Sequence, residues 1–406
     1  MYCSESPQTI SAGNSGDTVP NTGAGAFLNW TEGAEVRTAR WLSESGAPPV
    51  RRVVIVDDRT TADEAYGLAC QGTALLWRGD FQNARQMLRA LTQRADRQPR
   101  ETKRRAASPM ATSPAEAFHR HRQAQSRRAR TLGSLLVPLE EDYGIPLRRA
   151  PDVRQACVEA WGPGTGPAVV SLRALLGAIG AHEWRRKGIQ IAAIGGRIHP
   201  HYGVFAPVRS EYVELVVTAS LPVLCSTRSS AFDIGTGTGV LAAVLARRGL
   251  KRIVATDVDP RALTCARENL EHLGLTQQVQ VVLADLFPDG RAALVVCNPP
   301  WVSARPTSSL ERGIYDPESR MLRRFLGMLP THLEPGGEGW LILSDLAEHL
   351  GLRTRSQLLA AFDAAGLRVV GRSDTYPKHP RAFDATDPLH VARAAEVTSL
   401  WRLAVR

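Results

Sequence analysis

The chain has 406 residues, of which 43% are hydrophobic and 22% are charged. This composition is typical of globular proteins, and the length allows two domains with a sizeable core. No apolar run approaches the roughly 18 residues that span a bilayer, which argues against a membrane protein. The six cysteines have no paired spacing, so neither a metal site nor a disulfide framework is expected.

The beginning of the chain lacks the basic start and the apolar core of a secretory signal. We therefore expect a disordered polar tail over residues 1–50 and a cytoplasmic location. The net charge of +10 is concentrated in an Arg-rich loop expected over 94–130, where eleven Lys and Arg stand against three acids. Such a segment is either a solvated basic linker or an arm that contacts the phosphates of RNA or DNA.

Residues 51–187 are expected to form a mainly helical substrate-recognition domain that begins with a short strand at 51–58. Over 62–95, apolar residues recur at intervals of three and four, which predicts two helices with a turn at Gly79-Asp80. Three further helices are expected over 131–141, 152–161 and 168–187.

A β-hairpin around Gly195-Gly196 is expected in a linker over 188–228. From 229 to 406 the pattern alternates between apolar strands and single helices and ends in a pair of strands. That alternation predicts an α/β domain built on a doubly wound, Rossmann-like sheet. The expected strands before the final pair are 229–234, 251–257, 278–284, 292–297 and 339–344.

The first of these strands runs into the glycine-rich stretch "DIGTGTG", which precedes a helix. Glycines allow tight turns and close approach of a ligand, and the helix N-terminus offers unpaired N–H groups. The next two strands end at Asp257-Val258 and Asp285-Leu286, so one crevice should collect ligand-binding residues from three strand ends. The candidate residues of the glycine stretch are Asp233, Ile234, Gly235, Thr236, Gly237 and Gly239.

A nicotinamide dinucleotide is one ligand for such a crevice, because Asp257 could accept the hydroxyls of a ribose. However, Asp233 at the start of the loop would repel a pyrophosphate, whereas it could hold an ammonium group directly or through water. S-adenosylmethionine carries a ribose, an adenine and an ammonium group but no phosphate. Asp285 would suit the amino group of its adenine.

The fourth strand ends in "NPPW", Asn298, Pro299, Pro300 and Trp301. The side-chain oxygen of Asn298 and the carbonyl of Pro299 can each accept one N–H of a planar amino group. Two such bonds would direct the nitrogen lone pair toward a methyl donor. The prolines make this carbonyl geometry rigid, and Trp301 offers an aromatic face for a planar amide or base.

Taken together, "DIGTGTG", Asp257, Asp285 and "NPPW" resemble the motifs of class I S-adenosylmethionine-dependent methyltransferases over about 197–406. Within that superfamily, "NPPW" is similar to the motif of the N-methylating branch, and the nearest resemblance is to protein-glutamine N5-methyltransferases that modify release factors. Small-domain rRNA methyltransferases are similar too. The resemblance implies a seven-stranded methyltransferase sheet, S-adenosyl-L-methionine as cofactor and methyl transfer to nitrogen.

Two macromolecular acceptors remain open at this point. The resemblance favours a glutamine side chain of a release-factor-like protein. The alternative is the exocyclic amino group of a purine in RNA or DNA, adenine N6 or guanine N2, which Trp301 would stack on and the Arg-rich segment would hold by phosphate contacts. A biosynthetic small-molecule amine, and a binding module without catalysis, are weaker interpretations.

Overall fold

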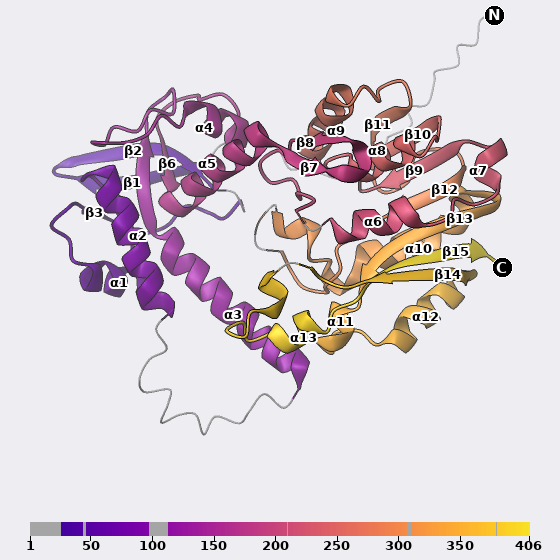
Figure 1. The fold of residues 1–406 in the computed structure, drawn as a ribbon. Coiled ribbons are helices and arrows are strands. Elements are labelled where there is room, and N and C mark those ends of the chain that lie inside the picture. Colours follow the sequence, from indigo (N-terminus) through magenta and orange to yellow (C-terminus); the bar gives the residue numbers. More distant parts are fainter. Residues whose placement is uncertain are drawn as a thin grey trace, which may run out of the picture.

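The computed structural model shows two β-sheets, each with its own hydrophobic core, joined by a small hairpin (Figure 1). The N-terminal sheet lies on the left of the view and the C-terminal sheet on the right. In the part of the chain that the structure describes, no helix is both long and apolar enough to cross a membrane. The described residues are 26–43, 46–96, 113–208, 210–306, 308, 310–378 and 380–406.

The N-terminal domain is a mixed six-stranded sheet in the order β1-β2-β6-β5-β4-β3 with helices packed on it. Its strands are β1 Phe27–Glu32, β2 Glu35–Leu42, β3 Val53–Val56, β4 Ala74–Trp77, β5 Leu135–Leu139 and β6 Ala168–Ser171. Its helices are α1 Ala62–Cys70, α2 Phe81–Asp96, α3 Pro114–Gly133, α4 Arg154–Trp161 and α5 Leu172–Lys187.

The expectation of a mainly helical N-terminal domain is therefore wrong, because short apolar runs were assigned to helices. Leu75 and Leu76 belong to strand β4 and face opposite cores, so both are fully buried. A strand buried on both faces has a continuous apolar run, and over so few residues that run matches a helical pattern equally well. The same ambiguity explains β5, which lies in the expected helix 131–141.

Two further expectations change in this domain. Residues 1–25 lie outside the described residues, but 27–42 form the β1–β2 hairpin instead of a tail, because Leu28 and Ala39 are buried in the sheet core. Of the Arg-rich loop, 97–112 lies outside the described residues, 94–96 are the end of α2, and 114–130 belong to α3 instead of a loop. Ser113 caps α3, and Phe118 and Leu132 on it are buried.

The linker contains the expected hairpin, an antiparallel pair of β7 (Ile189–Ile191) and β8 (Gly196–Ile198) joined by η2 (Ala192–Ile194). Two helices follow before the second sheet, α6 (Glu211–Thr218) and α7 (Leu224–Thr227).

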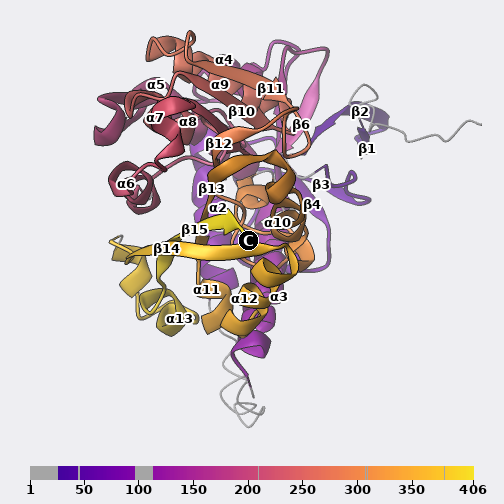
Figure 2. The same cartoon turned by 90° about the vertical axis from the view of Figure 1, so that its right-hand side faces the viewer.

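The C-terminal domain is a seven-stranded sheet in the order β11-β10-β9-β12-β13-β15-β14, in which β15 runs antiparallel to both neighbours (Figure 2). The expected α/β sheet is thus present. Its strands are β9 Ser230–Ile234, β10 Arg252–Asp257, β11 Val279–Leu283, β12 Ala292–Cys297, β13 Leu333–Ser344, β14 Leu367–Thr375 and β15 Thr398–Val405. Its helices are α8 Val240–Arg247, α9 Pro260–His272, α10 Arg320–His332, α11 Leu346–His349, α12 Arg355–Ala364 and α13 His390–Ala394, with short turns η3 Leu310–Gly313, η4 Pro317–Ser319 and η5 Pro380–Phe383.

Candidate active site

Strand register brings the candidate residues of three strands to one level at the carboxyl edge of the C-terminal sheet. In the central strand β9, Ile234 is paired with Thr256 of β10 on one side and with Cys297 of β12 on the other. The next residue of each strand is therefore Gly235, Asp257 or Asn298. Neighbouring strands lie about 4.8 Å apart, so these three positions lie side by side at the carboxyl edge of the sheet, where ligands bind in open α/β sheets; we call this region the crevice.

The glycine loop that follows β9 adopts backbone conformations that side chains disfavour. Gly235, Gly237 and Gly239 have φ angles of 71°, 55° and 81°, all in the left-handed region. A Cβ on Gly239 would also lie 3.3 Å from the Cα of Ala266 in α9. The Thr236 amide donates to the Thr256 carbonyl over 2.8 Å, which ties the loop to β10. The loop is consequently compact and carries no Cβ at these three positions.

Asp233 is buried beneath this loop with one carboxylate oxygen unpaired. Its Oδ2 accepts hydrogen bonds from the Thr236 hydroxyl (2.6 Å) and the Ala242 amide (3.0 Å). Its Oδ1 is buried and has no hydrogen-bond partner among the described residues. Burial raises the pKa of Asp233 to about 6, although the two hydrogen bonds act in the opposite direction. A cation near this carboxylate would compensate its desolvation.

Asp257 orders the backbone around the same crevice. Its Oδ2 accepts from the Gly237 amide (3.0 Å) and its Oδ1 from the Asp259 amide (2.9 Å). Burial raises the pKa of Asp257 as well. The adjacent Val258 is 61% exposed, so it presents an apolar surface at the rim of the crevice.

Asp285 lies farther out than the sequence pattern suggested. The last residue of β11, Leu283, is level with Asp257, so Asp285 follows two residues beyond the strand end. Its carboxylate forms a bidentate ion pair with Arg324 of α10, with distances of 3.1 and 2.9 Å. Leu286 has a φ angle of 78°, is buried, and accepts a hydrogen bond at its carbonyl from the Thr256 hydroxyl.

At the end of β12, Asn298 and Trp301 contact each other. The Trp301 indole Nε1 donates to Asn298 Oδ1 over 2.9 Å. An indole N–H can only donate, so this bond orients the Asn298 amide with its oxygen toward the ring. Trp301 is only half-buried but packs against three hydrophobic clusters, one of which contains Val302 and Phe118 of α3. Trp301 is thus fixed by packing and orients the Asn298 amide through its hydrogen bond. Its ring does not project freely from the strand end.

Met321 is a residue of this crevice that the sequence pattern missed. A Cβ placed on Gly235 would lie 3.2 Å from Met321 Cε, so the methionine side chain covers the glycine loop from α10. Asp316 holds the start of α10 there, because its carboxylate accepts from the amides of Met321 and Leu322, each over 3.1 Å. The signal in the sequence was an acid a few residues before an amphipathic helix, which is typical of helix capping.

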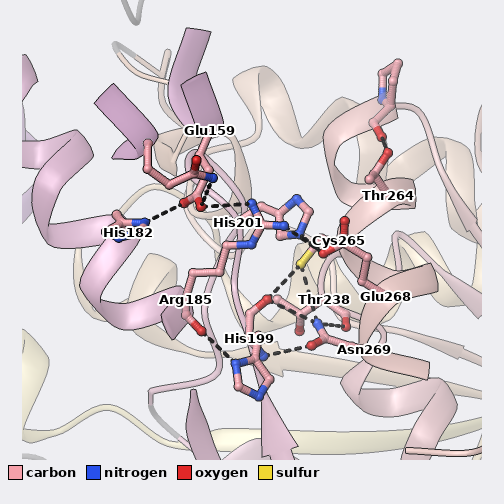
Figure 3. Close-up of polar contacts among 12 residues, drawn as sticks. Glu159, His182, Arg185, His199, His201, Thr238, Thr264, Cys265, Glu268 and Asn269 are labelled. Carbon is pink, nitrogen blue, oxygen red and sulfur yellow. Dashed lines mark hydrogen bonds and ion pairs between the residues drawn. The ribbon is translucent and has the colours of Figure 1, made fainter. Parts of the chain in front are cut away.

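A polar network connects the N-terminal domain to the back of the glycine loop (Figure 3). Asn269 of α9 donates to the Thr238 carbonyl (3.0 Å) and accepts from the His199 amide (2.8 Å). The neighbouring Glu268 binds Arg185 of α5 and His201, each over 2.8 Å. Burial lowers the pKa of His201. None of these residues was singled out in the sequence, because their partners are distant along the chain.

Comparisons with known proteins find sequence similarity in the C-terminal part of the chain. Residues 195–365 match the family model of the methyltransferase small domain. The chain is 49% identical over 69 residues to ribosomal protein L11 methyltransferase of Pelotomaculum thermopropionicum, covering 16% of this chain and 22% of the relative.

Two further relatives match longer segments. Release factor glutamine methyltransferase of Cereibacter sphaeroides is 36% identical over 154 residues, covering 34% of this chain and 52% of the relative. Ribosomal RNA small subunit methyltransferase C of Alcanivorax borkumensis is 35% identical over 112 residues, covering 27% and 30%. The chain thus spans about half or less of the length of these three relatives. Over residues 195–365, the chain is therefore similar to the methyltransferase small domain.

Proposed function

We propose that the protein is an S-adenosylmethionine-dependent methyltransferase that transfers a methyl group to a planar amide or amino nitrogen. The observation that carries this proposal is the register of the central strands, which puts Asn298 and Asp257 on the two sides of Gly235. A methyl donor held over the glycine loop would therefore lie beside the group that orients the acceptor.

The residues around the glycine loop fit S-adenosylmethionine. The unpaired, buried Oδ1 of Asp233 suits the ammonium group of the cofactor, directly or through water. Asp257 uses its carboxylate oxygens for the Gly237 and Asp259 amides, and the remaining lone pairs can accept ribose hydroxyls. The left-handed glycines leave space for close approach. When bound, this cofactor supplies an electrophilic methyl group on a sulfonium centre.

The acceptor side would orient the nucleophile. An amide nitrogen is a poor nucleophile because its lone pair is delocalised, so it must be aligned with the methyl–sulfur axis. Asn298 Oδ1 keeps one lone pair beyond its bond to Trp301, and the Pro299 carbonyl supplies a second acceptor. Both acceptors would bind the nitrogen more strongly as it gains positive charge, which favours the transition state. The proton can leave to water after methyl transfer.

A protein glutamine side chain is the acceptor that we favour. The release-factor relative acts on glutamine by its name, and its similarity extends over 154 residues. The arginines of α3 also support a protein acceptor, because several are engaged within the chain. Arg122 pairs with Glu311 and Arg128 pairs with Asp96, so both charges are compensated internally. The indole N–H of Trp301 is engaged as well.

The alternative acceptor is the exocyclic amino group of a purine in RNA or DNA. It is supported by the similarity to an rRNA methyltransferase and by the exposed side chain of Arg130 near the end of α3, which could contact a phosphate.

Methyl transfer to a cell extract distinguishes these acceptors. The full chain is incubated with extract and S-adenosylmethionine labelled in its methyl group, and samples are then digested with protease or with nucleases. We expect label that protease releases and that hydrolysis identifies as N5-methylglutamine. Label released by nucleases would establish the purine instead. The absence of label in any macromolecule or small molecule, despite cofactor binding by calorimetry, would refute methyl transfer.

A further inference from the structure

The loop after Trp301 is folded back on itself by backbone hydrogen bonds. We call residues 302–316, of which 307 and 309 lie outside the described residues, the acceptor loop. The Val302 amide donates to the Ile314 carbonyl (3.2 Å), and the Asp316 amide donates to the Val302 carbonyl (2.9 Å). This bridge places Tyr315 beside Val302 at the acceptor end of β12. The bridge consists of few bonds, so the loop needs further support to keep one conformation.

That support comes from α3, a helix of the N-terminal domain that extends along the C-terminal domain toward α11 and α13 in both views (Figures 1 and 2). Arg122 forms a bidentate ion pair with Glu311 of the acceptor loop, with distances of 3.0 and 3.1 Å. Its guanidinium also donates to the Arg305 carbonyl (2.8 Å) and lies 4.2 Å from the centre of the Tyr315 ring. One side chain thus holds the loop at three points.

Burial strengthens the contacts of Arg122 with the acceptor loop. The side chains of Arg122 and Glu311 are only 17% and 26% exposed, so solvent screens the pair less than a pair on an open surface. Phe118, one helical turn earlier on the same face of α3, is buried against Val302 and Leu350. A planar guanidinium satisfies the bidentate and stacked contacts together, which a lysine ammonium cannot do.

The contacts continue from the acceptor loop to the glycine loop. Tyr315 precedes Asp316, whose carboxylate caps the start of α10 at Met321 and Leu322. Met321 in turn covers Gly235. The position of α3 therefore affects both sides of the crevice. It contacts the acceptor loop and Leu350 directly, and it is connected to the glycine loop through Asp316 and Met321.

We propose that Arg122 is a positioning residue for methyl transfer, through which the N-terminal domain holds the acceptor loop in the conformation that completes the acceptor site. The charge pattern indicated that the Arg-rich segment is a solvated linker or an arm that contacts nucleic acid. Its residue Arg122 instead binds the acceptor loop and holds it in place. The inference rests on the proposed function, because the loop matters for catalysis only if Asn298 orients an acceptor.

The test compares Arg122→Ala and Arg122→Lys with Arg127→Ala, which removes an exposed arginine of the same helix. In Arg122→Ala we expect kcat/KM for the acceptor to fall by about 10- to 100-fold, the range for losing a bidentate charged contact. Cofactor affinity by calorimetry should stay within about threefold. Arg122→Lys keeps the positive charge but loses the paired N–H donors of the guanidinium. Its kcat/KM should therefore lie between those of the wild type and Arg122→Ala. Arg127→Ala should behave as wild type.

Hydrogen exchange provides a second readout that does not need activity. The amides of Val302 and Asp316 should exchange at least about tenfold faster in Arg122→Ala than in the wild type or in Arg127→Ala, while the Ala242 amide in the domain core stays unchanged. Unchanged exchange at Val302 and Asp316, or equal kinetics of Arg122→Ala and Arg127→Ala, would overturn the inference. A wild type that transfers no methyl group contradicts the proposed function, whereas the exchange experiment still decides whether Arg122 positions the loop.

Discussion

The two sides of the crevice are stabilised over very different distances along the chain. On the cofactor side, Thr236 bonds to Asp233 three residues away, and Gly237 bonds to Asp257 twenty residues away. On the acceptor side, Arg122 reaches Glu311 across 189 residues. The glycine loop and Asp257 therefore belong to one βαβ unit, whereas the acceptor side depends on the packing of two domains.

This difference has a consequence for function. A glycine loop and ribose acid built from one local unit are compatible with many acceptors, because a separate part of the protein shapes the acceptor site. If the two sides are separable, substitutions on the acceptor side should have the largest effect, on turnover, and substitutions on the cofactor side should mainly weaken cofactor binding.

Replacing Asn298 by alanine should lower kcat by about 100- to 1,000-fold, the loss typical of removing one group that stabilises a transition state. Cofactor affinity should remain nearly unchanged, because Asn298 is assigned to the acceptor. Single-turnover kinetics and calorimetry on the same preparation measure the two effects. Asn298→Asp, which keeps an acceptor oxygen, is the matched control and should retain more activity than alanine. A large loss of cofactor affinity in Asn298→Ala would assign the residue to the other side.

Replacing Asp257 by alanine should give the opposite result. It should weaken cofactor binding by about 1 to 3 kcal/mol through loss of the ribose acceptors and of the bond to the Gly237 amide. The control is Asp285→Ala, whose carboxylate is largely exposed and paired with Arg324, so its effect on affinity should be smaller, within about fivefold. Calorimetric titration measures both. If the two substitutions weaken cofactor binding equally, Asp257 does not contribute more to cofactor affinity than Asp285, which contradicts this assignment.

The buried Asp233 should make cofactor affinity depend on pH. Because burial raises its pKa to about 6, it is largely protonated at pH 5 and ionised at pH 7. A bound ammonium group favours the ionised form, so affinity should increase by up to about tenfold as pH rises from 5 to 7. Asp233→Asn should show a flatter pH profile. Asp257, whose pKa burial also raises, is present in both proteins, so the difference between the profiles reports Asp233. Parallel profiles would argue against an ammonium at Asp233.

The same pKa shift affects the stability of the cofactor-free protein in the reverse sense. An unfolded Asp titrates near pH 4, so between about pH 4 and 6 the folded protein holds a proton that the unfolded chain releases. The free energy of unfolding contributed by Asp233 should therefore fall as pH rises through this window. Denaturant titrations of the wild type and Asp233→Asn check this sign.

The smallest effect is expected for Trp301→Phe. It removes the hydrogen bond that orients the Asn298 amide but keeps most of the packing, so kcat should fall only by about 2- to 10-fold. Trp184→Phe, which alters a half-exposed tryptophan on α5, is the control. Rapid-quench measurement of methyl transfer detects the difference. A loss as large as that of Asn298→Ala would indicate that the indole itself contacts the acceptor.

The positions of the glycine loop and of Asp257 at the strand ends could be predicted from the sequence because short-range patterns specify them. A strand, three alternating glycines and an acid at the next strand end restrict the backbone within a few tens of residues. The helices and strands of the C-terminal sheet were predictable for the same reason, since their apolar runs are separated by clear glycine and proline breaks.

The N-terminal sheet and the contacts of the acceptor side were not predictable in this way. Leu75 and Leu136 lie in strands whose apolar runs are too short to distinguish from helix, and only their strand partners resolve that choice. Likewise, the arginines of α3 read as a single basic charge pattern, although Arg122 and Arg128 bind different domains. Local patterns thus specify backbone turns and strand ends, whereas the partner of a long charged side chain depends on which distant surface folding brings against it.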